Sequence, residues 1–344
     1  MKGHRPVALG ALVAVLATVA AVAAATSSGS HKKTYSLAYV PPVIANPIIK
    51  AGNDAMSIQA KSLGMKFSTV GGEYNPQAQI VAVNAVLQRK FDALAIWPLD
   101  PKGIKPSIAK ARKAGLPVFV QDSPSSTPPA NINFALDDYD ATYKLAQYAA
   151  AQIKKTGKTC SVGIVQGLTF IEILNNRNRG LEAGARASGC KILAKQVNTK
   201  DNTDGAKPIV DAWKTKYGSD MTGVLAYNDP SALAAVADLG GDFDPLITGV
   251  NGDSLAIGAL KRGDMLATMA QPAIEFGATI AWSASQVLNG RKLPSTIWNY
   301  HALVTRGNVS RYVTLENRLK QGPWNVRIVK QKGRNVAIVT PKKK

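Results

Sequence analysis

Residues 34–70 read TYSLAYVPPVIANPIIKAGNDAMSIQAKSLGMKFSTV and contain an expected strand, helix and second strand in that order. Short runs rich in apolar and β-branched residues at 34–40 and 65–70 predict the strands. Between them, residues 48–63 have a helical pattern that Gly64 closes. Strands that alternate with helices of this length form βαβ units, so the segment predicts a parallel sheet.

The same alternation continues along the chain in two similar halves. The first half is completed by expected helices at 76–89 and 102–114 and expected strands at 93–97, 117–121 and 132–136. After Asp137 the pattern restarts, with helices expected at 139–155, 173–188, 203–216, 231–239 and 254–261 and strands at 160–166, 192–197, 223–227 and 247–250. A late helix at 273–288 suggests a return to the first half. The expected fold class is therefore α/β, with two similar doubly wound parallel-sheet lobes.

A secretory signal peptide is expected at residues 1–25. Lys2 and Arg5 precede an apolar run at 7–25 that ends in three alanines, and a polar Ser/Gly segment follows. The alternative is an uncleaved membrane anchor, because about twenty apolar residues can span a bilayer. No cysteine lies near the cleavage point, so a lipoprotein is not expected. The mature protein should therefore be periplasmic, extracellular or associated with the cell envelope.

Size and charge narrow the class of protein further. The 344 residues include 42 basic and 22 acidic side chains, which give a formal net charge of +20. A single hydrophobic core usually stops growing at about 250–300 residues, so two domains are expected. The basic residues are spread along the chain, which fits an anionic envelope surface better than nucleic acid. We therefore expect no nucleic-acid partner.

Cys160 and Cys190 are the two cysteines of the chain. Each comes at the start of an expected strand, and the two strands should be parallel neighbours, so both thiols should lie at the same end of the sheet. A disulfide is favoured in an exported chain, and two separate buried thiols are the alternative. The three histidines, at positions 4, 31 and 301, offer too few partners for a metal site, so neither a metal nor another cofactor is expected.

Polar and aromatic residues gather in the loops that follow the expected strands. Open α/β sheets bind ligands beyond the carboxyl ends of their strands, so these loops should hold the ligand. Amide, carboxylate and guanidinium groups can bond to hydroxyls, and Trp can stack on a carbohydrate face. Each residue also has a structural alternative, as a turn, a helix cap, a core aromatic or a solvated arginine. The candidate ligand-binding residues are Asn46, Trp97, Asp122, Asp137, Arg179, Tyr227, Asn228, Asn251 and Gln271.

Several short segments resemble the periplasmic sugar-binding proteins of the ribose/galactose type, which are substrate-binding subunits of ABC transporters. They are Asn46-Pro47 and residues 117–122, 176–180, 226–229, 248–252 and 267–272, and the resemblance covers residues 34–312. It implies two lobes joined by three crossing strands near Asp137, Gln271 and Ala302, with the ligand cleft between the lobes. The first lobe would comprise residues 34–137 and 272–301, and the second 138–271 and 302–315.

The resemblance also implies a function. A monomeric receptor would capture a sugar or sugar-like polyol by lobe closure and would deliver it to a membrane permease. Its polar ligand contacts would be Asn46, Asp122, Asp137, Arg179, Asn228 and Gln271. Ile48 and Ile49 stand where ribose binders of this family have two aromatic residues. The alternative is therefore a non-sugar ligand in the same cleft, such as a signalling furanone or a nucleoside, for uptake or sensing.

An enzyme and a transcription regulator are the rival classes of protein. The chain has no Gly-x-Ser-x-Gly motif, and no Glu is among the candidate residues, so no enzymatic activity is expected. A sugar-responsive repressor of this fold would need a helix-turn-helix where this chain has its apolar N-terminal run. Beyond the lobes, residues 316–344 are basic and alternate apolar side chains, which predicts a β-hairpin with its turn at 332–334.

Overall fold

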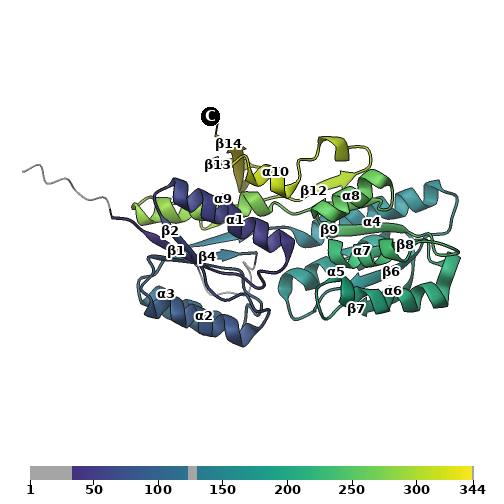
Figure 1. Ribbon diagram of the computed structural model, residues 1–344, viewed down its shortest axis with the longest axis horizontal. Coiled ribbons are helices and arrows are strands. Elements are labelled where there is room, and N and C mark those ends of the chain that lie inside the picture. Colours follow the sequence, from purple (N-terminus) through teal and green to yellow (C-terminus); the bar gives the residue numbers. More distant parts are fainter. Residues whose placement is uncertain (1–32, 123–129, 343–344) are drawn as a thin grey trace, which may run out of the picture. The chain divides into compact units, whose positions relative to one another are not determined.

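The computed structural model describes residues 33–122 and 130–342 (Figure 1). The expected signal peptide at residues 1–25 lies outside these ranges. Within the described ranges, no helix combines the length and the apolar character needed to cross a bilayer. Residues 34–344 group together by their internal contacts, and their strands belong to two separate sheets.

The first sheet has eight strands in the order β13-β14-β11-β5-β4-β3-β1-β2. They are β1 (Ser36–Val40), β2 (Lys66–Thr69), β3 (Ala93–Ile96), β4 (Val118–Gln121), β5 (Ile132–Ala135), β11 (Thr296–Trp298), β13 (Trp324–Gln331) and β14 (Arg334–Pro341). All paired neighbours are parallel except β13 and β14. One face packs against α1 (Pro47–Ser62), α9 (Ala273–Leu288) and α10 (Leu315–Leu319), and the other against α2 (Pro76–Gln88) and α3 (Lys105–Lys113) (Figure 1). We call this sheet and its helices the first lobe.

The second sheet has six strands in the order β12-β10-β9-β8-β6-β7. They are β6 (Ser161–Gln166), β7 (Lys191–Val197), β8 (Gly223–Ala226), β9 (Leu246–Asn251), β10 (Ala267–Ala270) and β12 (Ala302–Thr305), of which only β12 is antiparallel to its neighbour. One face packs against α4 (Asp138–Lys155) and α5 (Glu172–Ala187). The other packs against α6 (Thr203–Tyr217), α7 (Asp229–Ala237) and α8 (Ser254–Arg262). Short 3-10 turns occur at Gly218–Asp220 and Val309–Arg311, and we call this sheet and its helices the second lobe.

These two helix-covered parallel sheets confirm the predicted α/β fold class. The chain leaves the first sheet after β5, returns to the first lobe after β10, and passes again from β11 to β12. It crosses a fourth time after β12, because β13 and β14 belong to the first sheet. The residue boundaries that the sequence suggested for the lobes stay a prediction.

The central strands are apolar along their whole length because helices cover both faces of each sheet. All residues of β3 (Ala93–Ile96), β4 (Val118–Gln121) and β8 (Gly223–Ala226) are buried. The first lobe has a separate apolar cluster on each face of its sheet. The core therefore holds the strand ends, and with them the loops after the strands, in fixed positions.

The C-terminal hairpin extends the first sheet. Strand β14 pairs in parallel with β11 through Trp298 and Val336, and β13 pairs with β14 from Trp324 opposite Pro341 to Gln331 opposite Arg334. The Trp324 side chain is buried. The Gln59 side chain bonds to both the backbone amide and the carbonyl of Trp324, which ties the hairpin to α1. The tail is thus part of the first lobe.

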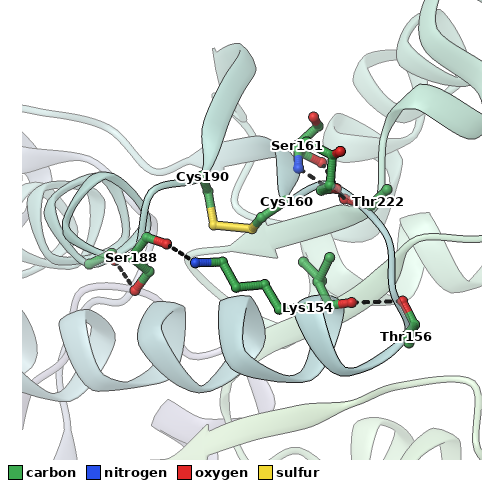
Figure 2. Close-up of a disulfide and its surroundings, with 10 residues drawn as sticks. Lys154, Thr156, Cys160, Ser161, Ser188, Cys190 and Thr222 are labelled. Carbon is green, nitrogen blue, oxygen red and sulfur yellow. Dashed lines mark hydrogen bonds between the residues drawn. A yellow bond between two sulfur atoms is a disulfide. The ribbon is translucent and has the colours of Figure 1, made fainter.

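Cys160 and Cys190 form a disulfide, which is the pairing that the sequence favoured (Figure 2). Cys160 directly precedes β6 and Cys190 directly precedes β7, and these strands are parallel neighbours. The two Cα atoms are 4.6 Å apart. Nearby, Lys154 Nζ donates to the Ser188 carbonyl at 2.7 Å and joins the end of α4 to the end of α5. The disulfide lies at the amino ends of the strands, opposite to the edge expected to bind a ligand.

Candidate ligand-binding site

The candidate ligand pocket lies where the strand order of each sheet reverses. In the first sheet β1 is flanked by β2 and β3, and in the second β6 is flanked by β7 and β8. At such a switch point the loops after the two central strands diverge and leave a crevice. The pocket is lined by the loops after β1, β3, β6 and β8, so both lobes contribute to it. The space between its atoms, including the part open to solvent, is about 470 Å³.

Apolar and polar residues are distributed unequally around this pocket. The first lobe supplies mostly apolar side chains, and most polar ones come from the second lobe. The apolar lining residues are Pro42, Val43, Ile48, Ile49, Trp97, Pro98, Leu99, Ile171, Ile173 and Leu174. The polar ones are Asn46, Tyr74, Arg177, Asp201, Asn228, Asn251 and Gln271.

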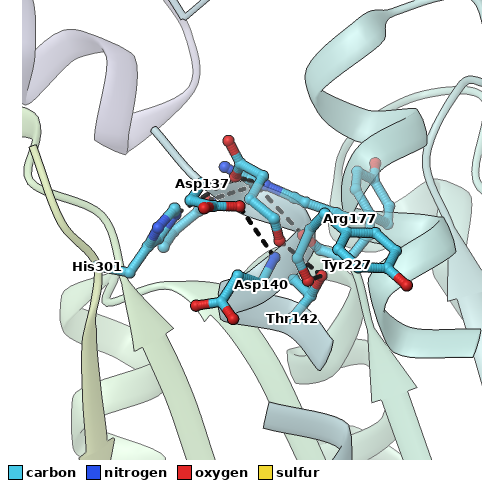
Figure 3. Close-up of polar contacts among 9 residues, drawn as sticks. Asp137, Asp140, Thr142, Arg177, Tyr227 and His301 are labelled. Atoms are coloured by element: carbon cyan, nitrogen blue, oxygen red, sulfur yellow. Dashed lines mark hydrogen bonds and ion pairs between the residues drawn. The ribbon is translucent and has the colours of Figure 1, made fainter. Parts of the chain in front are cut away.

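Arg177 is the only basic residue that lines the pocket in the described parts of the chain. Its Nε donates to Asp138 Oδ1 at 2.8 Å, and its Nη1 donates to the Tyr227 carbonyl and to Asn251 Oδ1, both at 3.3 Å. Its buried Nη2 has no hydrogen-bond partner among the described residues. In Figure 3, Arg177 and His301 approach the start of α4 from opposite sides. Arg177 therefore has one donor group available for a ligand.

Arg179 and Asp137 do not lie where the sequence analysis expected them. Arg179 is exposed, lies over the Tyr139 ring at 5.6 Å and does not line the pocket. Successive helix residues are rotated by about 100°, so a shift of two positions moves a side chain to the opposite face. Asp137 instead caps α4 by accepting from the Asp140 amide at 3.2 Å, and Asp138 is the carboxylate that meets Arg177.

Asp201 is a pocket residue that the sequence analysis missed. Its Oδ1 accepts from the Tyr227 hydroxyl at 2.6 Å and from Asn228 Nδ2 at 2.9 Å. Its Oδ2 accepts from Asn46 Nδ2 at 3.3 Å, a bond that joins the two lobes across the pocket. Burial raises the pKa of Asp201, although these hydrogen bonds oppose the increase. Asp201 follows β7, at the same edge of the sheet as the other loops. This position in the sequence could have identified it as a candidate pocket residue.

Asp122 lies beside the pocket and does not line it. Its carboxylate is buried, and burial together with the negative charge of Asp138 raises its pKa. Burial alone would also raise the pKa of Asp138, but the charge and hydrogen bond of Arg177, together with the neighbouring His301 imidazole, lower it. His301 Nε2 is 3.3 Å from Asp138 Oδ1. These groups form a buried cluster of ionisable side chains at the junction of the lobes.

The other predicted residues lie at the pocket or directly behind it. Asn46, Trp97, Asn228, Asn251 and Gln271 line it, and Tyr227 is buried and reaches Asp201 through its hydroxyl. Asn46 and Asn228 are also helix caps, because their Oδ1 atoms accept from the amides of Ile48 and Ser231. The structural and the ligand-binding interpretations are therefore compatible at these two positions.

Three residues that line the pocket have an unusual backbone conformation. Tyr74, Asp201 and Asn251 have φ values of 55°, 55° and 136°, which residues other than glycine rarely adopt. Such conformations occur most often at functional sites, where the surrounding structure holds them in place. No cluster of three or more His, Cys, Asp or Glu side chains within residues 33–122 and 130–342 is arranged to hold a metal ion. The pocket lining offers both hydrogen-bonding groups and apolar surface.

Known proteins share this architecture. The ribose import binding protein RbsB of Bacillus subtilis is 26% identical over 273 residues, which cover 79% of this chain and 87% of that protein. The xylitol-binding protein of Mycolicibacterium smegmatis is 24% identical over 265 residues, covering 76% and 74% of the two chains. Among solved structures, an ABC transporter solute binding protein from Burkholderia graminis in complex with D-arabinose has a TM-score of 0.75. It is 20% identical, and the match covers 82% of this chain and 99% of that chain.

The family match spans most of the described chain. The sequence profile of the family described as "Periplasmic binding protein domain" matches residues 37–292, which include strands of both sheets and every residue that lines the pocket. Because this match covers more than half of the chain, the protein is a member of the periplasmic binding protein family.

Proposed function

We propose that this protein captures a sugar or sugar-like polyol between its two lobes and delivers it to the permease of an ABC transporter. The observation that carries the proposal is the meeting of polar groups from both lobes in one pocket. Asn46 of the first lobe and Asp201 of the second are 3.3 Å apart there, and Arg177 lines the same pocket. Relatives named for ribose and xylitol support a hydroxylated ligand.

Lobe closure is the mechanism that fits this geometry. Periplasmic binding proteins are a standard example of hinge closure around a ligand. In this chain the short connections after β5, β10 and β11 can bend while both sheets stay intact. Each lobe carries only part of the lining, so a ligand forms its full set of contacts only when the lobes meet. The permease would then recognise the closed form.

The charges at the pocket favour a neutral ligand. The positive charge of Arg177 is paired with Asp138, and Asp201 has no ion-pair partner among the described residues. A sugar acid or sugar phosphate would bring a further negative charge next to Asp201, and like charges repel strongly where water is excluded. We therefore propose neutral sugars or polyols as the substrate class.

The setting of this activity is part of the same proposal. Residues 1–25 would direct export as a signal peptide, and the mature protein would act in the periplasm or at the outer face of the cell envelope. It would act as a monomer, without a cofactor, a lipid anchor or a chemical reaction. The relatives that match are binding proteins named for their ligands, which supports a role in transport.

A thermal denaturation screen tests the proposal. The purified protein is heated with each of a panel of neutral pentoses, hexoses and polyols, with uronic acids, nucleosides and amino acids as comparison ligands. A ligand at about 100 times its Kd stabilises the folded state by about 2.7 kcal/mol, which corresponds to a shift in Tm of roughly 5–10 °C. We expect at least one neutral sugar or polyol to produce this shift. A shift with nucleosides or amino acids alone would contradict the proposal.

A further inference from the structure

Both lobes contribute to an apolar corner of the pocket. Ile48, Ile49, Trp97 and Leu99 of the first lobe form its walls, and all four are buried. The second lobe closes it with the start of α5, where Ile171 and Ile173 are each 4% exposed. We call these six residues the apolar corner. They belong to a single hydrophobic cluster, although they come from both lobes.

The arrangement of the apolar corner differs from a flat stacking surface. An aromatic platform contacts the C–H face of a sugar ring and leaves the hydroxyls at the rim free to bond. Here aliphatic side chains come from both lobes beside the Trp97 ring, so a ligand group that enters the corner meets apolar surface from both lobes. A hydroxyl in that position would lose its bonds to water, and the only hydrogen-bonding side-chain group among the six corner residues is the indole N–H of Trp97, which can donate to the hydroxyl but cannot accept its proton.

The polar residues that line the pocket have few unused hydrogen-bonding groups. Asn46 and Asn228 each use Oδ1 to cap a helix and Nδ2 to bond Asp201. Asn251 Oδ1 accepts from Arg177. In contrast, Arg177 Nη2 and the Tyr74 hydroxyl are buried without a hydrogen-bond partner in the described part of the chain. The groups most available to a ligand therefore lie outside the apolar corner.

We propose that the pocket selects a 6-deoxyhexose over the hexose that carries a hydroxyl at carbon 6. This inference rests on the proposed function and names the substrate class of the same site. The methyl group of the 6-deoxy sugar fills the apolar corner, and its ring hydroxyls face Arg177, Tyr74 and Asp201. The parent hexose places its extra hydroxyl in the corner, where none of the six side chains can accept its proton.

Calorimetric titration of the wild-type protein with matched sugar pairs tests the proposal. The pairs are D-fucose with D-galactose, L-rhamnose with L-mannose, and 6-deoxy-D-glucose with D-glucose, and each pair differs by one hydroxyl. We expect one 6-deoxy sugar to bind roughly tenfold to a hundredfold more tightly than its parent, the range typical of a single group in an apolar pocket.

The other outcomes separate this inference from the proposed function. If every hexose that binds does so at least as tightly as its 6-deoxy partner, the inference is overturned and the proposed function stands. Binding that is confined to pentoses or acyclic polyols would also overturn the inference and leave the proposed function standing. If no neutral sugar or polyol binds, both proposals fail.

Two variants locate the preference in the apolar corner. Ile173→Thr and Ile49→Thr each add a hydroxyl group to the corner on a β-branched side chain, and we expect either to reduce the preference for the 6-deoxy sugar at least about threefold. Val81→Thr is the matched control, because Val81 is 60% exposed on α2 and does not line the pocket. An unchanged preference in a corner variant that still binds would contradict the assignment of the corner. The wild-type comparison decides the proposal even if a corner variant fails to fold.

Discussion

Arg177 Nε lies 2.8 Å from Asp138 Oδ1, and each of the two side chains is only 3% exposed. Asp138 begins α4, directly after the chain leaves the first sheet, and Arg177 comes from α5 of the second lobe. The same guanidinium bonds to Asn251 and lines the pocket. This ion pair therefore connects the junction between the lobes with the lining of the pocket.

Asp138→Asn should destabilise the protein much more than Asp137→Asn. Removing one partner of a buried ion pair costs about 3–5 kcal/mol, because the Arg177 charge is left without its partner. Asp137 is half-buried, and Asn can still cap the helix, so its substitution should cost less than about 1 kcal/mol. Urea denaturation of both variants measures the difference. Equal losses would show that Asp138 does not hold a buried ion pair.

Asp229→Asn should increase stability at neutral pH. Burial raises the pKa of Asp229 to about 6, well above its ordinary 3.8, even though Thr268 and two backbone amides donate to it. A raised pKa means that the folded state favours the protonated form, so the wild type loses stability as the pH rises from about 4 to about 6. Asn can accept from the amides of Gly252 and Asp253 and donate to Thr268, and it has no charge to bury.

The pH dependence distinguishes this effect from a change in packing. Denaturation curves at about pH 4 and pH 7 should show that the variant gains up to about 3 kcal/mol relative to the wild type between the two conditions. Below about pH 4 both folded and unfolded wild-type chains are protonated at Asp229, so charge makes no difference there. A stability difference that is the same at both pH values would contradict the raised pKa.

Replacing both cysteines by serine should lower stability without affecting ligand binding. The disulfide closes a loop with a sequence separation of 30 residues, for which chain entropy predicts a loss of about 3–4 kcal/mol. Cys160 and Cys190 lie at the amino ends of their strands and do not line the pocket. Thermal denaturation and calorimetric titration of the double variant measure the two quantities. A large loss of affinity in a folded double variant would contradict this separation.

Arg334→Ala should weaken the attachment of the C-terminal hairpin at the junction of the lobes. The guanidinium lies 3.9 Å from the centroid of the Trp298 ring, and Nη1 is 3.5 Å from Asp137 Oδ2. Because these groups are partly exposed, we expect a loss of only about 1 kcal/mol in unfolding free energy. Arg334→Lys should recover only part of this loss, since Lys lacks the planar group.

Arg327→Ala is the control for the hairpin, because Arg327 is exposed on the neighbouring strand β13. Its substitution should leave the urea midpoint unchanged. If the alanine variants at 327 and 334 lose stability equally, the contacts of Arg334 with Trp298 and Asp137 do not stabilise the hairpin.

The regular alternation of strands and helices was sufficient to predict the fold class. Strands such as β3 and β8 are buried on both faces, so their sequences are continuous apolar runs that can be recognised locally. The same rule identified most of the loops that line the pocket, because parallel strands end at a common edge. Asn46, Asn228 and Asn251, which line the pocket, could therefore be placed at this edge of the sheets from the sequence.

Side-chain direction and long-range contact could not be predicted in this way. Arg177 and Arg179 are both arginines of α5, and only the rotation of the helix against β6 decides which one is buried. Asp201 lies in a polar loop in which several residues are equally suitable candidates for the pocket lining. Its partners Asn46 and Tyr227 are 155 and 26 positions away along the chain, so only the folded structure brings them together.

Isothermal titration of the wild type, Arg177→Gln and Arg179→Gln with the sugar or polyol that stabilises the protein most tests the central claim directly. We expect one ligand per wild-type chain, a loss of affinity of at least about 100-fold in Arg177→Gln, and wild-type affinity in Arg179→Gln, provided that both variants are folded. Wild-type affinity in a folded Arg177→Gln, or the absence of any neutral sugar or polyol that binds, would contradict the account.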